Sequence, residues 1–440
     1  MILEFSVRNF RSYNKKQTLS FEATSDETLE DFFCYKVSPK VRLLKLGVIY
    51  GANASGKSNL LSALAYLKRI ATNPRERDDK TFFKPFIFNE ESQKSPGEFD
   101  IFFYYKQIKY HYFVKIGRNN VYEEKLEYYP KAQPVEVFSR RKQEISFGSH
   151  QTVKLAKKFR DALETNTMNS MTLISALKKT NVDCDIYNNV LDWFSFKLLP
   201  NISSRTNLKN WTTDKFDDND GCRNLILELI KKADFNVNNI KLQKDKIPID
   251  NEIREDILQL KNIPDKVKEQ ILEQGEIEGR ELLFFHKISH DGADKYMPLD
   301  YEEESAGTKR YYGLGGPLSE AMINSRILII DELESSLHPD LLNHFIRTFL
   351  VNSTDSQLIF TTHNLSVIAE PDEIRRDVIW FTEKDRMGQT ELYSLSDFRT
   401  SDIRKGMSYL NAYKAGKFGA IPNLGEIYLN NGEDNGEENK

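Results

Sequence analysis

The sequence contains little cysteine, and its three cysteines lie far apart in the chain. Cys34, Cys184 and Cys222 show none of the short spacings at which cysteines bind a metal ion. Isolated thiols of this kind usually pack as small buried hydrophobes, and they persist in a reducing compartment. The sequence therefore predicts neither a disulfide framework nor a cysteine-ligated metal centre.

Long hydrophobic runs are also missing. No apolar stretch approaches the ~18 residues that a membrane-spanning helix needs. The first residues, Met1–Phe5, lack the positively charged and apolar regions of a signal peptide. We therefore expect a cytoplasmic protein that has no membrane partner.

Neither sign of charge dominates, since 62 basic side chains stand against 66 acidic ones and the net charge is -4. This balance removes the simplest argument for a general nucleic-acid binder, so a local patch would have to supply the attraction. The stretch from Arg140 to Thr180 is a candidate patch, because lysine and arginine are in excess there. A solvated helix face is the simpler interpretation, and a surface for DNA, RNA or an acidic partner is the alternative.

What the sequence does contain is enough apolar material for a core, over a length greater than one ordinary domain. Its 440 residues are 39% hydrophobic, which predicts two domains or one head with a long insertion. Strand-like alternation dominates residues 1–147, and strand character returns in residues 281–425. Residues 148–280 show helical periodicity and are interpreted as a helical insertion, whereas residues 426–440 predict a disordered acidic tail.

The most specific motif is Gly51–Ser58, which matches the pattern G-x-x-x-x-G-K-[ST] of a phosphate-binding loop. It lies in the required context, between the apolar run Leu43–Tyr50 and a helical stretch over Asn59–Ile70. Backbone N–H groups surround the phosphates, Lys57 reaches the β- and γ-phosphates, and the Ser58 hydroxyl ligates Mg²⁺. We therefore expect ATP and Mg²⁺ as cofactors, with the nucleotide bound by Gly51, Asn53, Ala54, Ser55, Gly56, Lys57, Ser58 and Asn59.

A second apolar strand, Ile327–Ile330, ends in two adjacent carboxylates. In a nucleotide hydrolase, Asp331 would hold Mg²⁺ and Glu332 would accept a proton from the attacking water. Glu334 is an alternative base, and Glu332 is preferred because it adjoins Asp331. Taken alone, the pattern also fits a buried strand that meets a polar turn.

Two further candidates depend on their position relative to these motifs. His363 follows another apolar strand, where it is either structural or able to bond the γ-phosphate or the attacking water. Ser305 and Gly307 belong to Glu304–Arg310, a segment that precedes Asp331 and opens a predicted helix. By itself a Ser-x-Gly sequence is an ordinary helix cap.

The order of these motifs resembles that of ABC-type ATPases of the SMC, RecF and OLD branch. The phosphate-binding loop comes first, followed by the signature-like Glu304–Arg310, the pair Asp331–Glu332, the D-loop-like Ser335–Pro339 and His363. The narrower resemblance is to the RloA-like and AbiL-type ATPases of bacterial phage-defence systems. It rests on Val7–Ser12, on Asp331–Pro339 and on Tyr413–Pro422.

The resemblance implies an α/β fold, in which an ABC-type P-loop head combines a mixed β lobe with a parallel-sheet core of the RecA type. It covers residues 1–130 and 280–425 and leaves the helical insertion unassigned. In these terms, 1–147 is the amino-terminal part of the head with the Walker A loop. Residues 281–425 are its carboxy-terminal part, with the signature, the Walker B strand, the D-loop and the switch histidine.

The resemblance also implies a homodimer. Ser305 and Gly307 of one subunit would contact the γ-phosphate that Lys57 holds in the other, so neither subunit would have a complete site. Arg11 resembles the basic residue that related heads place near the nucleotide. The signature here reads Glu-Ser-Ala-Gly-Thr in place of Leu-Ser-Gly-Gly-Gln, which makes this motif less specific. The glutamine of the Q-loop is Gln93, Gln107 or neither.

The function that the resemblance implies is an ATP-hydrolysing sensor or scaffold subunit of an anti-phage, abortive-infection system. Closure of the dimer, or of a higher assembly of dimers, would control a separately encoded effector. That effector is expected to be a nuclease of the RloB or TOPRIM type, and a phage protein would serve as the trigger. The alternative is a DNA-repair clamp similar to RecF and SMC proteins, in which ATP closure traps DNA.

Overall fold

The computed structural model describes residues 1–260, 263–290, 293–399 and 406–423. The tail expected at 426–440 lies outside these residues. The chain forms two compact units. The P-loop unit contains Ile2–Leu29, Gly47–Asn188 and the described residues from Thr361 onward, and the ribbon unit contains Met1, Glu30–Leu46 and Asn189–Phe360.

The P-loop unit contains a seven-stranded antiparallel sheet with the strand order β10-β9-β8-β7-β6-β1-β2. One face of this β lobe is apolar, because buried residues such as Phe99 and Ile101 alternate with more exposed ones. Phe5 lies opposite Leu19 in the antiparallel pair β1–β2, in agreement with the strand-like alternation of residues 1–147. The strands are β1 (Ile2–Arg8), β2 (Gln17–Ser20), β6 (Gly97–Tyr105), β7 (Ile108–Ile116), β8 (Val121–Tyr129), β9 (Val135–Arg141) and β10 (Glu144–Phe147).

A second group of strands in this unit contains β5, the strand that directly precedes the phosphate-binding loop. β5 (Leu46–Gly51) is buried along its whole length and pairs in parallel with β17 (Ile379–Lys384). β17 also pairs antiparallel with β18 (Thr390–Ser394). The helix α2 (Lys57–Thr72) follows the loop and buries the leucines that recur at helical spacing. Further helices in this part of the chain are α3 (Glu90–Lys94), α4 (Lys157–Asn166), α5 (Leu173–Ala176), α6 (Asp185–Asp192) and α13 (Tyr409–Lys414).

The ribbon unit contains three parallel strands in the order β11-β15-β16. β15 (Ile327–Ile330) lies between β11 (Leu198–Ile202) and β16 (Gln357–Thr361), and every residue of β15 is buried. Burial on both faces explains why this strand appears in the sequence as a continuous apolar run. Two shorter strands, β3 (Cys34–Ser38) and β4 (Val41–Leu44), form a separate antiparallel pair.

Helices of the ribbon unit pack around the long helix α11 (Ala306–Asn324). α11 contacts α7 (Lys209–Asp218) and α8 (Asp220–Lys231). Gly316 allows this close approach, because a Cβ atom there would lie 2.5 Å from the Thr212 hydroxyl oxygen. The helix α12 (Pro339–Asn352) also contacts α11, and the short helix α1 (Glu30–Phe33) contacts α12.

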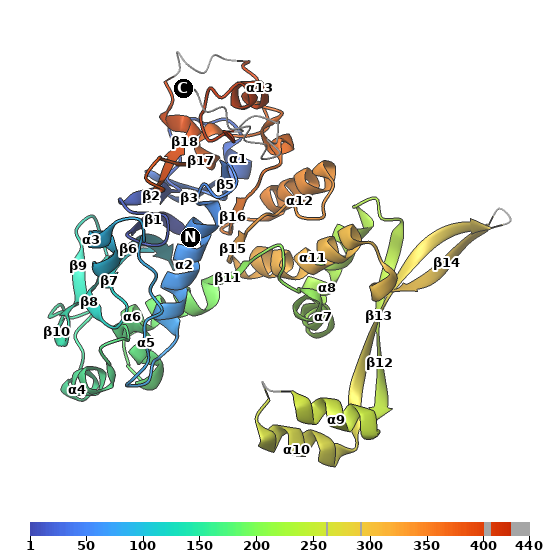
Figure 1. The fold of residues 1–440 in the computed structure, drawn as a ribbon, viewed down its shortest axis with the longest axis horizontal. Coiled ribbons are helices and arrows are strands. Elements are labelled where there is room, and N and C mark those ends of the chain that lie inside the picture. The colour runs from blue at the N-terminus through green and yellow to red at the C-terminus, as the bar shows by residue number, and fades with distance from the viewer. Residues whose placement is uncertain (261–262, 291–292, 400–405, 424–440) are drawn as a thin grey trace, which may run out of the picture. The chain divides into compact units, whose positions relative to one another are not determined.

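A long antiparallel ribbon gives this unit its name. β13 (Glu276–His290) pairs with β12 (Val237–Pro248) on one side and with β14 (Ala293–Asp300) on the other. The helices α9 (Asn251–Gln259) and α10 (Asp265–Gln274) lie at the end of the β12–β13 ribbon (Figure 1). Helices were expected within residues 148–280 and strands from residue 281 onward, whereas β12 was not expected, because most of its residues are exposed and show no apolar alternation.

These elements confirm the predicted fold class, an α/β P-loop fold with a mixed β lobe. Parallel strands occur in both units, and the phosphate-binding loop joins a buried strand to a helix. None of the described helices combines the length and hydropathy that crossing a bilayer requires.

Lys45 is a buried lysine that binds the end of α12. Its ammonium group donates to the carbonyl oxygens of Leu350 (2.9 Å) and Ser353 (2.8 Å). Burial lowers the pKa of Lys45 from 10.5 to about 8, although Cys34 acts in the opposite direction. The unfolded chain therefore binds more protons between these values, so the free energy of unfolding should rise from pH 8 to pH 10.5. Urea denaturation should show a smaller rise in Lys45→Met, and equal rises in the two proteins would contradict this.

Candidate nucleotide-binding site

The backbone of the phosphate-binding loop requires glycine at two positions. Gly51 ends β5 with a φ of +156°, and Gly56 precedes α2 with a φ of +120°. A Cβ atom on Gly56 would lie 2.7 Å from the Cγ2 atom of Thr390. Ala54 also has a positive φ, of 62°. The loop is therefore wound tightly against its neighbours, which is the arrangement that lets backbone N–H groups surround a phosphate.

Lys57 and His363 lie together in the P-loop unit. The Lys57 ammonium donates to the carbonyl oxygens of Gly51 (2.9 Å) and Ala52 (3.1 Å), and its Nζ atom is 3.0 Å from Nε2 of His363. An ammonium group has no acceptor, so Nε2 is the acceptor in this pair. Lys57 and His363, which were proposed from separate motifs 306 positions apart, are thus in direct contact beside the loop.

The amino-terminal end of α2 is free of acidic side chains. Its first turn contains no aspartate or glutamate, and Asn53, Ala54 and Ser58 are exposed. The partial positive charge of a helix amino terminus is therefore not neutralised by the helix itself, which suits a phosphate.

Arg11 lies over the first turns of α2. Its Nη1 atom donates to the side chains of Asn59 (3.2 Å) and Ser62 (3.2 Å), and Asn59 donates to the Ser12 hydroxyl (2.8 Å). Burial, and to a smaller extent the nearby Arg69, lower the pKa of Arg11. Arg11 therefore contacts the helix that follows the loop, and its role toward a nucleotide remains a proposal.

Three further side chains form hydrogen bonds with the phosphate-binding loop. No pattern in the sequence singles out these two threonines and this tyrosine. Thr390 donates from Oγ1 to the backbone carbonyl of Ser55 (2.7 Å), and Thr382 shares a hydrogen bond with the Ser55 hydroxyl (2.6 Å). The Tyr13 hydroxyl donates to the carbonyl of Gly56 (3.1 Å). These residues come from the turn after β1 and from β17 and β18, so no local motif could reveal them.

Thr390→Val should weaken ATP binding by about five- to tenfold. The substitution keeps the shape of the side chain but removes its hydrogen bond to Ser55, and such a bond contributes ~1 kcal/mol. Titration with a fluorescent ATP analogue would measure the change. Thr390→Ser, which keeps the hydroxyl, is the matched control, and equal weakening in both variants would rule out this role for the hydroxyl.

The two candidate carboxylates lie in the ribbon unit, directly after β15. The backbone N–H of Asp331 donates to the carbonyl of Ile202 (2.7 Å), which fixes the end of the strand. Glu332 has a φ of 55°, a conformation that costs energy in residues other than glycine. Its Oε2 atom accepts a hydrogen bond from the Ser204 hydroxyl (2.8 Å). Ser204 lies in the loop after β11 and belongs to no motif.

The signature-like segment and the D-loop-like segment lie side by side in the same unit. Ser305 is the N-cap of α11, and its Oγ atom accepts a hydrogen bond from the backbone N–H of Thr308 (3.0 Å). A Cβ atom on Gly307 would lie 3.2 Å from the carbonyl oxygen of Ser336. Ser305 is exposed, and the first turn of α11 contains no acidic residue. The free N–H groups of this helix end can bind an anion, while Glu302, Glu303 and Glu304, directly before Ser305, add negative charge nearby.

The candidate residues thus fall into two groups. The P-loop unit contains the loop Gly51–Ser58, Arg11 and His363, and the ribbon unit contains the Asp331–Glu332 pair and the Ser305–Gly307 turn. A model of the family described as "AAA domain, putative AbiEii toxin, Type IV TA system" matches residues 46–369. The chain belongs to this AAA-domain family. It is therefore an AAA-type ATPase by family, and the narrower RloA-like and AbiL-type resemblance remains a hypothesis.

Solved structures that match this AAA-family chain include SMC head domains. A head bound to the C-winged helix domain of ScpA has a TM-score of 0.40 and 13% identity, over 89% of this chain and 97% of its own. The SMC head domain from Thermotoga maritima has a TM-score of 0.38 and 11% identity, over 89% and 98%. A head with an extended coiled coil, bound to the C-terminal domain of ScpA derived from Pyrococcus furiosus, has a TM-score of 0.37 and 13% identity, over 95% and 98%. No curated protein matches the sequence.

Among the described residues, neither of the glutamines suggested for the Q-loop forms a hydrogen bond with the phosphate-binding loop. The Gln93 amide donates to the carbonyl of Ile87 (2.6 Å). Gln107 lies in the turn between β6 and β7, with a φ of 62°. The assignment of a Q-loop residue stays open.

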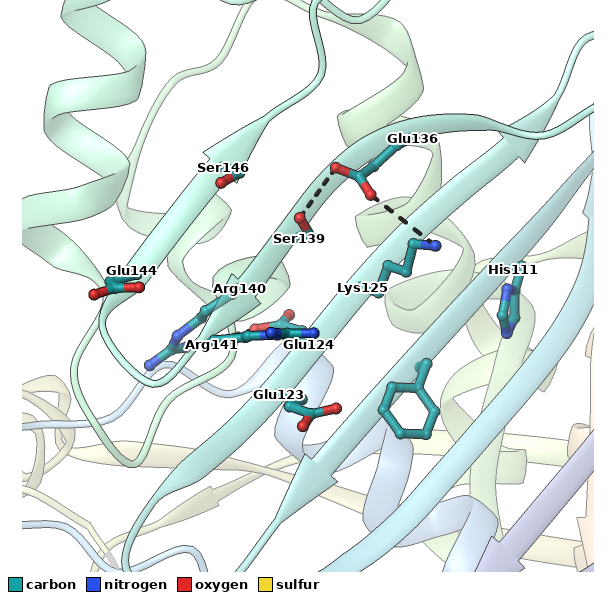
Figure 2. A pocket seen from close by; sticks show the side chains of 11 residues that line it. His111, Glu123, Glu124, Lys125, Glu136, Ser139, Arg140, Arg141, Glu144 and Ser146 are labelled. Carbon is teal, nitrogen blue, oxygen red and sulfur yellow. Dashed lines mark hydrogen bonds and ion pairs between the residues drawn. The ribbon is translucent and has the colours of Figure 1, made fainter.

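The basic stretch from Arg140 to Thr180 is less available to a partner than its composition suggests. Arg140 is fully buried beside Glu124 (Nη1 to Oε2, 3.5 Å), and Figure 2 labels both residues. Arg140 also donates to the Met171 carbonyl (2.6 Å). Lys179 forms an ion pair with Glu76 (3.0 Å). Burial raises the pKa of Glu124, while Arg140 acts to lower it. Part of the basic excess therefore serves the fold.

Proposed function

We propose that this AAA-family protein binds ATP with Mg²⁺ on the Gly51–Ser58 loop and hydrolyses it. One observation carries the proposal: the Lys57 ammonium lies between the loop carbonyls of Gly51 and Ala52 and the imidazole of His363. A cation at a glycine loop, beside a helix N-terminus without acidic residues, complements the negative charge of a nucleoside triphosphate.

Each candidate residue has a proposed role in this reaction. Lys57 neutralises charge on the β- and γ-phosphates, and His363 contacts the γ-phosphate or the attacking water. Glu332 accepts the proton of that water, and the Ser204 hydroxyl orients its carboxylate. The hydroxyl of Ser58 and the carboxylate of Asp331 would hold Mg²⁺, which supplies further neutralisation of phosphate charge.

We also propose that two copies of the chain close around the nucleotide. The Ser305–Gly307 turn starts a helix of 19 residues, it is exposed at Ser305, and its first turn has no acidic residue. This combination supports a contact with an anion from outside the chain. The γ-phosphate held by a second copy is the anion that the resemblance assigns to it.

In the cell, we propose that ATP-driven closure makes the protein the sensor or scaffold of a phage-defence system with a separate effector. The family description, which names an AbiEii toxin and a type IV TA system, supports this assignment. Cells expressing the gene with its neighbours should resist phage, and cells with Lys57→Ala should not. The effector, expected to be a nuclease, should co-purify with the wild-type protein. Equal phage sensitivity with and without the intact genes would contradict the defence role.

The enzymatic part of the proposal is tested by release of phosphate from ATP. The purified protein should hydrolyse ATP only with Mg²⁺, and chelation by EDTA should stop the reaction. Phosphate release that is unaffected by Lys57→Ala would assign the activity to another site or another protein.

A further inference from the structure

The described part of the carboxy-terminal region contains a compact segment that has no role in the site described above. We call Tyr409–Pro422 the C-terminal clasp. It consists of α13 and a turn in which Gly416, Gly419 and Ala420 all have a positive φ (73°, 65° and 56°). The Tyr413 hydroxyl donates to the carbonyl of Ala420 (2.9 Å) and closes the turn. The clasp is therefore a defined structure and not an extended tail.

The clasp is docked on β17 and β18 through aromatic side chains. The ring of Phe381 on β17 lies 5.7 Å from that of Tyr413 and 5.8 Å from that of Phe418, measured between centroids. The hydroxyl of Tyr393 on β18 donates to the carbonyl of Phe418 (2.8 Å). At Gly419, which has a φ of 65°, a Cβ atom would lie 2.6 Å from the Tyr393 hydroxyl oxygen and 2.7 Å from Oε2 of Glu383, so a larger residue would displace these side chains.

The docked clasp is connected to the candidate site through Tyr50. The Tyr413 ring lies 6.1 Å from the ring of Tyr50, the buried residue that directly precedes Gly51 of the phosphate-binding loop. The Tyr50 hydroxyl donates to the backbone carbonyl of Asn364 (3.0 Å), and Asn364 directly follows His363. α13 also packs against the short 3₁₀ turn Leu365–Ile368. The clasp and Tyr50 thus hold the chain on the carboxy-terminal side of His363.

On its amino-terminal side, the same chain is held by β5. The backbone N–H of Thr362 donates to the carbonyl of Ile49 (3.1 Å). His363 therefore lies between two contacts, the backbone bond of Thr362 to Ile49 and the bond of the Tyr50 hydroxyl to Asn364. Only the second contact involves a residue that packs against the clasp. An imidazole must keep its position to within a fraction of an ångström to contact a reacting group, so a change in the second contact has a direct effect on it.

We propose that the C-terminal clasp is a positioning element for His363, and that it acts through Tyr413 and Tyr50. Neither tyrosine needs to touch the nucleotide. With the clasp docked, the Tyr50 hydroxyl fixes the peptide after His363 and thereby aims the imidazole at the site beside Lys57. The inference rests on the proposed hydrolysis of ATP, because the position of His363 matters for turnover.

Gly419→Ala tests the docking of the clasp without touching the candidate site. The added methyl group collides with the Tyr393 hydroxyl and is strained at a φ of 65°. We expect kcat for ATP to fall at least about fivefold, while the Kd for ATP stays within about twofold, because the phosphate-binding loop is unchanged. Gly275→Ala is the matched control, since Gly275 has a similar φ of 71° and nothing lies within 4 Å of its added Cβ atom. Equal losses of kcat in both variants would overturn the proposal.

Tyr50→Phe tests the connection itself. It removes only the hydroxyl that binds Asn364, so the fold and the aromatic packing are retained. As for Gly419→Ala, we expect a lower kcat for ATP and an unchanged Kd for ATP. Tyr393→Phe, which loses the bond to Phe418, should give a smaller loss of the same kind. A variant that lowers thermal stability but leaves kcat unchanged would show that these side chains serve only the fold, and it would reject the inference.

Hydrogen exchange provides a readout that does not need activity. Amides of residues 362–369 should exchange faster in Gly419→Ala and Tyr50→Phe than in the wild type, and those of α2 should not. Unchanged exchange in residues 362–369 would overturn the inference. Absence of hydrolysis in the wild type, with the expected exchange pattern present, would instead reject the proposed ATPase function and leave the mechanical connection standing.

Discussion

Lys57→Ala should bind ATP at least about 100-fold more weakly than the wild type, which corresponds to about 2.8 kcal/mol. The reason is that Lys57 supplies the positive charge above the loop, while the remaining contribution comes from backbone N–H groups and the end of α2. Lys57 is buried, and its contacts with Gly51, Ala52 and His363 fix the position of this charge at the loop. Isothermal titration with Mg²⁺ and a non-hydrolysable ATP analogue would give the Kd.

The comparison needs a control on the same helix. Lys68→Ala removes a lysine from α2 at a position beyond its first turns, so its Kd should equal that of the wild type within error. Circular dichroism would confirm that both variants are folded. Retained affinity in Lys57→Ala would mean that the nucleotide binds elsewhere, and the assignment of the whole loop would then be wrong.

Glu332→Gln should retain ATP binding and lose turnover by a factor of about 10²–10⁴, the range typical of general acid–base catalysis. An amide of the same size can still accept the hydrogen bond from Ser204, but it cannot take a proton from water. The backbone strain at Glu332 supports this choice, because strained residues are often found at functional sites. Single-turnover measurement of phosphate release would separate the chemical step from product release.

Glu334→Gln is the matched test of the alternative base. Glu334 lies two positions further along the same turn, where the N–H of Leu337 donates to its backbone carbonyl (2.8 Å). We expect its turnover to stay within a few-fold of the wild type. A loss confined to Glu334→Gln would move the role of base to that residue.

The fold could be predicted where local sequence decides the structure. The strands β5, β15 and β16 are short, mainly apolar and buried along their whole length, and the glycine loop between β5 and α2 carries a recognised phosphate-binding pattern. The ribbon strand β12 could not be predicted, because its residues are mostly exposed on an isolated ribbon and carry no alternation.

The candidate site was predictable in its motifs and not in its supports. Lys57, Asp331 and His363 stand in local patterns that their chemistry requires. Thr390, Tyr50 and Ser204 support those residues through contacts between distant segments, and a hydroxyl in a strand or loop has no special pattern in a sequence. For the basic stretch from Arg140 to Thr180, composition overstates the exposed positive charge. It cannot distinguish an exposed lysine from the buried ion pair of Arg140 and Glu124.

We propose that two copies of the chain close around ATP, with Ser305 of one copy at the phosphate held by the other. Sedimentation velocity of Glu332→Gln with Mg²⁺ and ATP tests it most directly. We expect a dimer with ATP and a smaller species without it. The double variant Glu332→Gln, Ser305→Arg should lose the ATP-dependent dimer. A protein that binds ATP but keeps one sedimentation coefficient under all these conditions would contradict the claim.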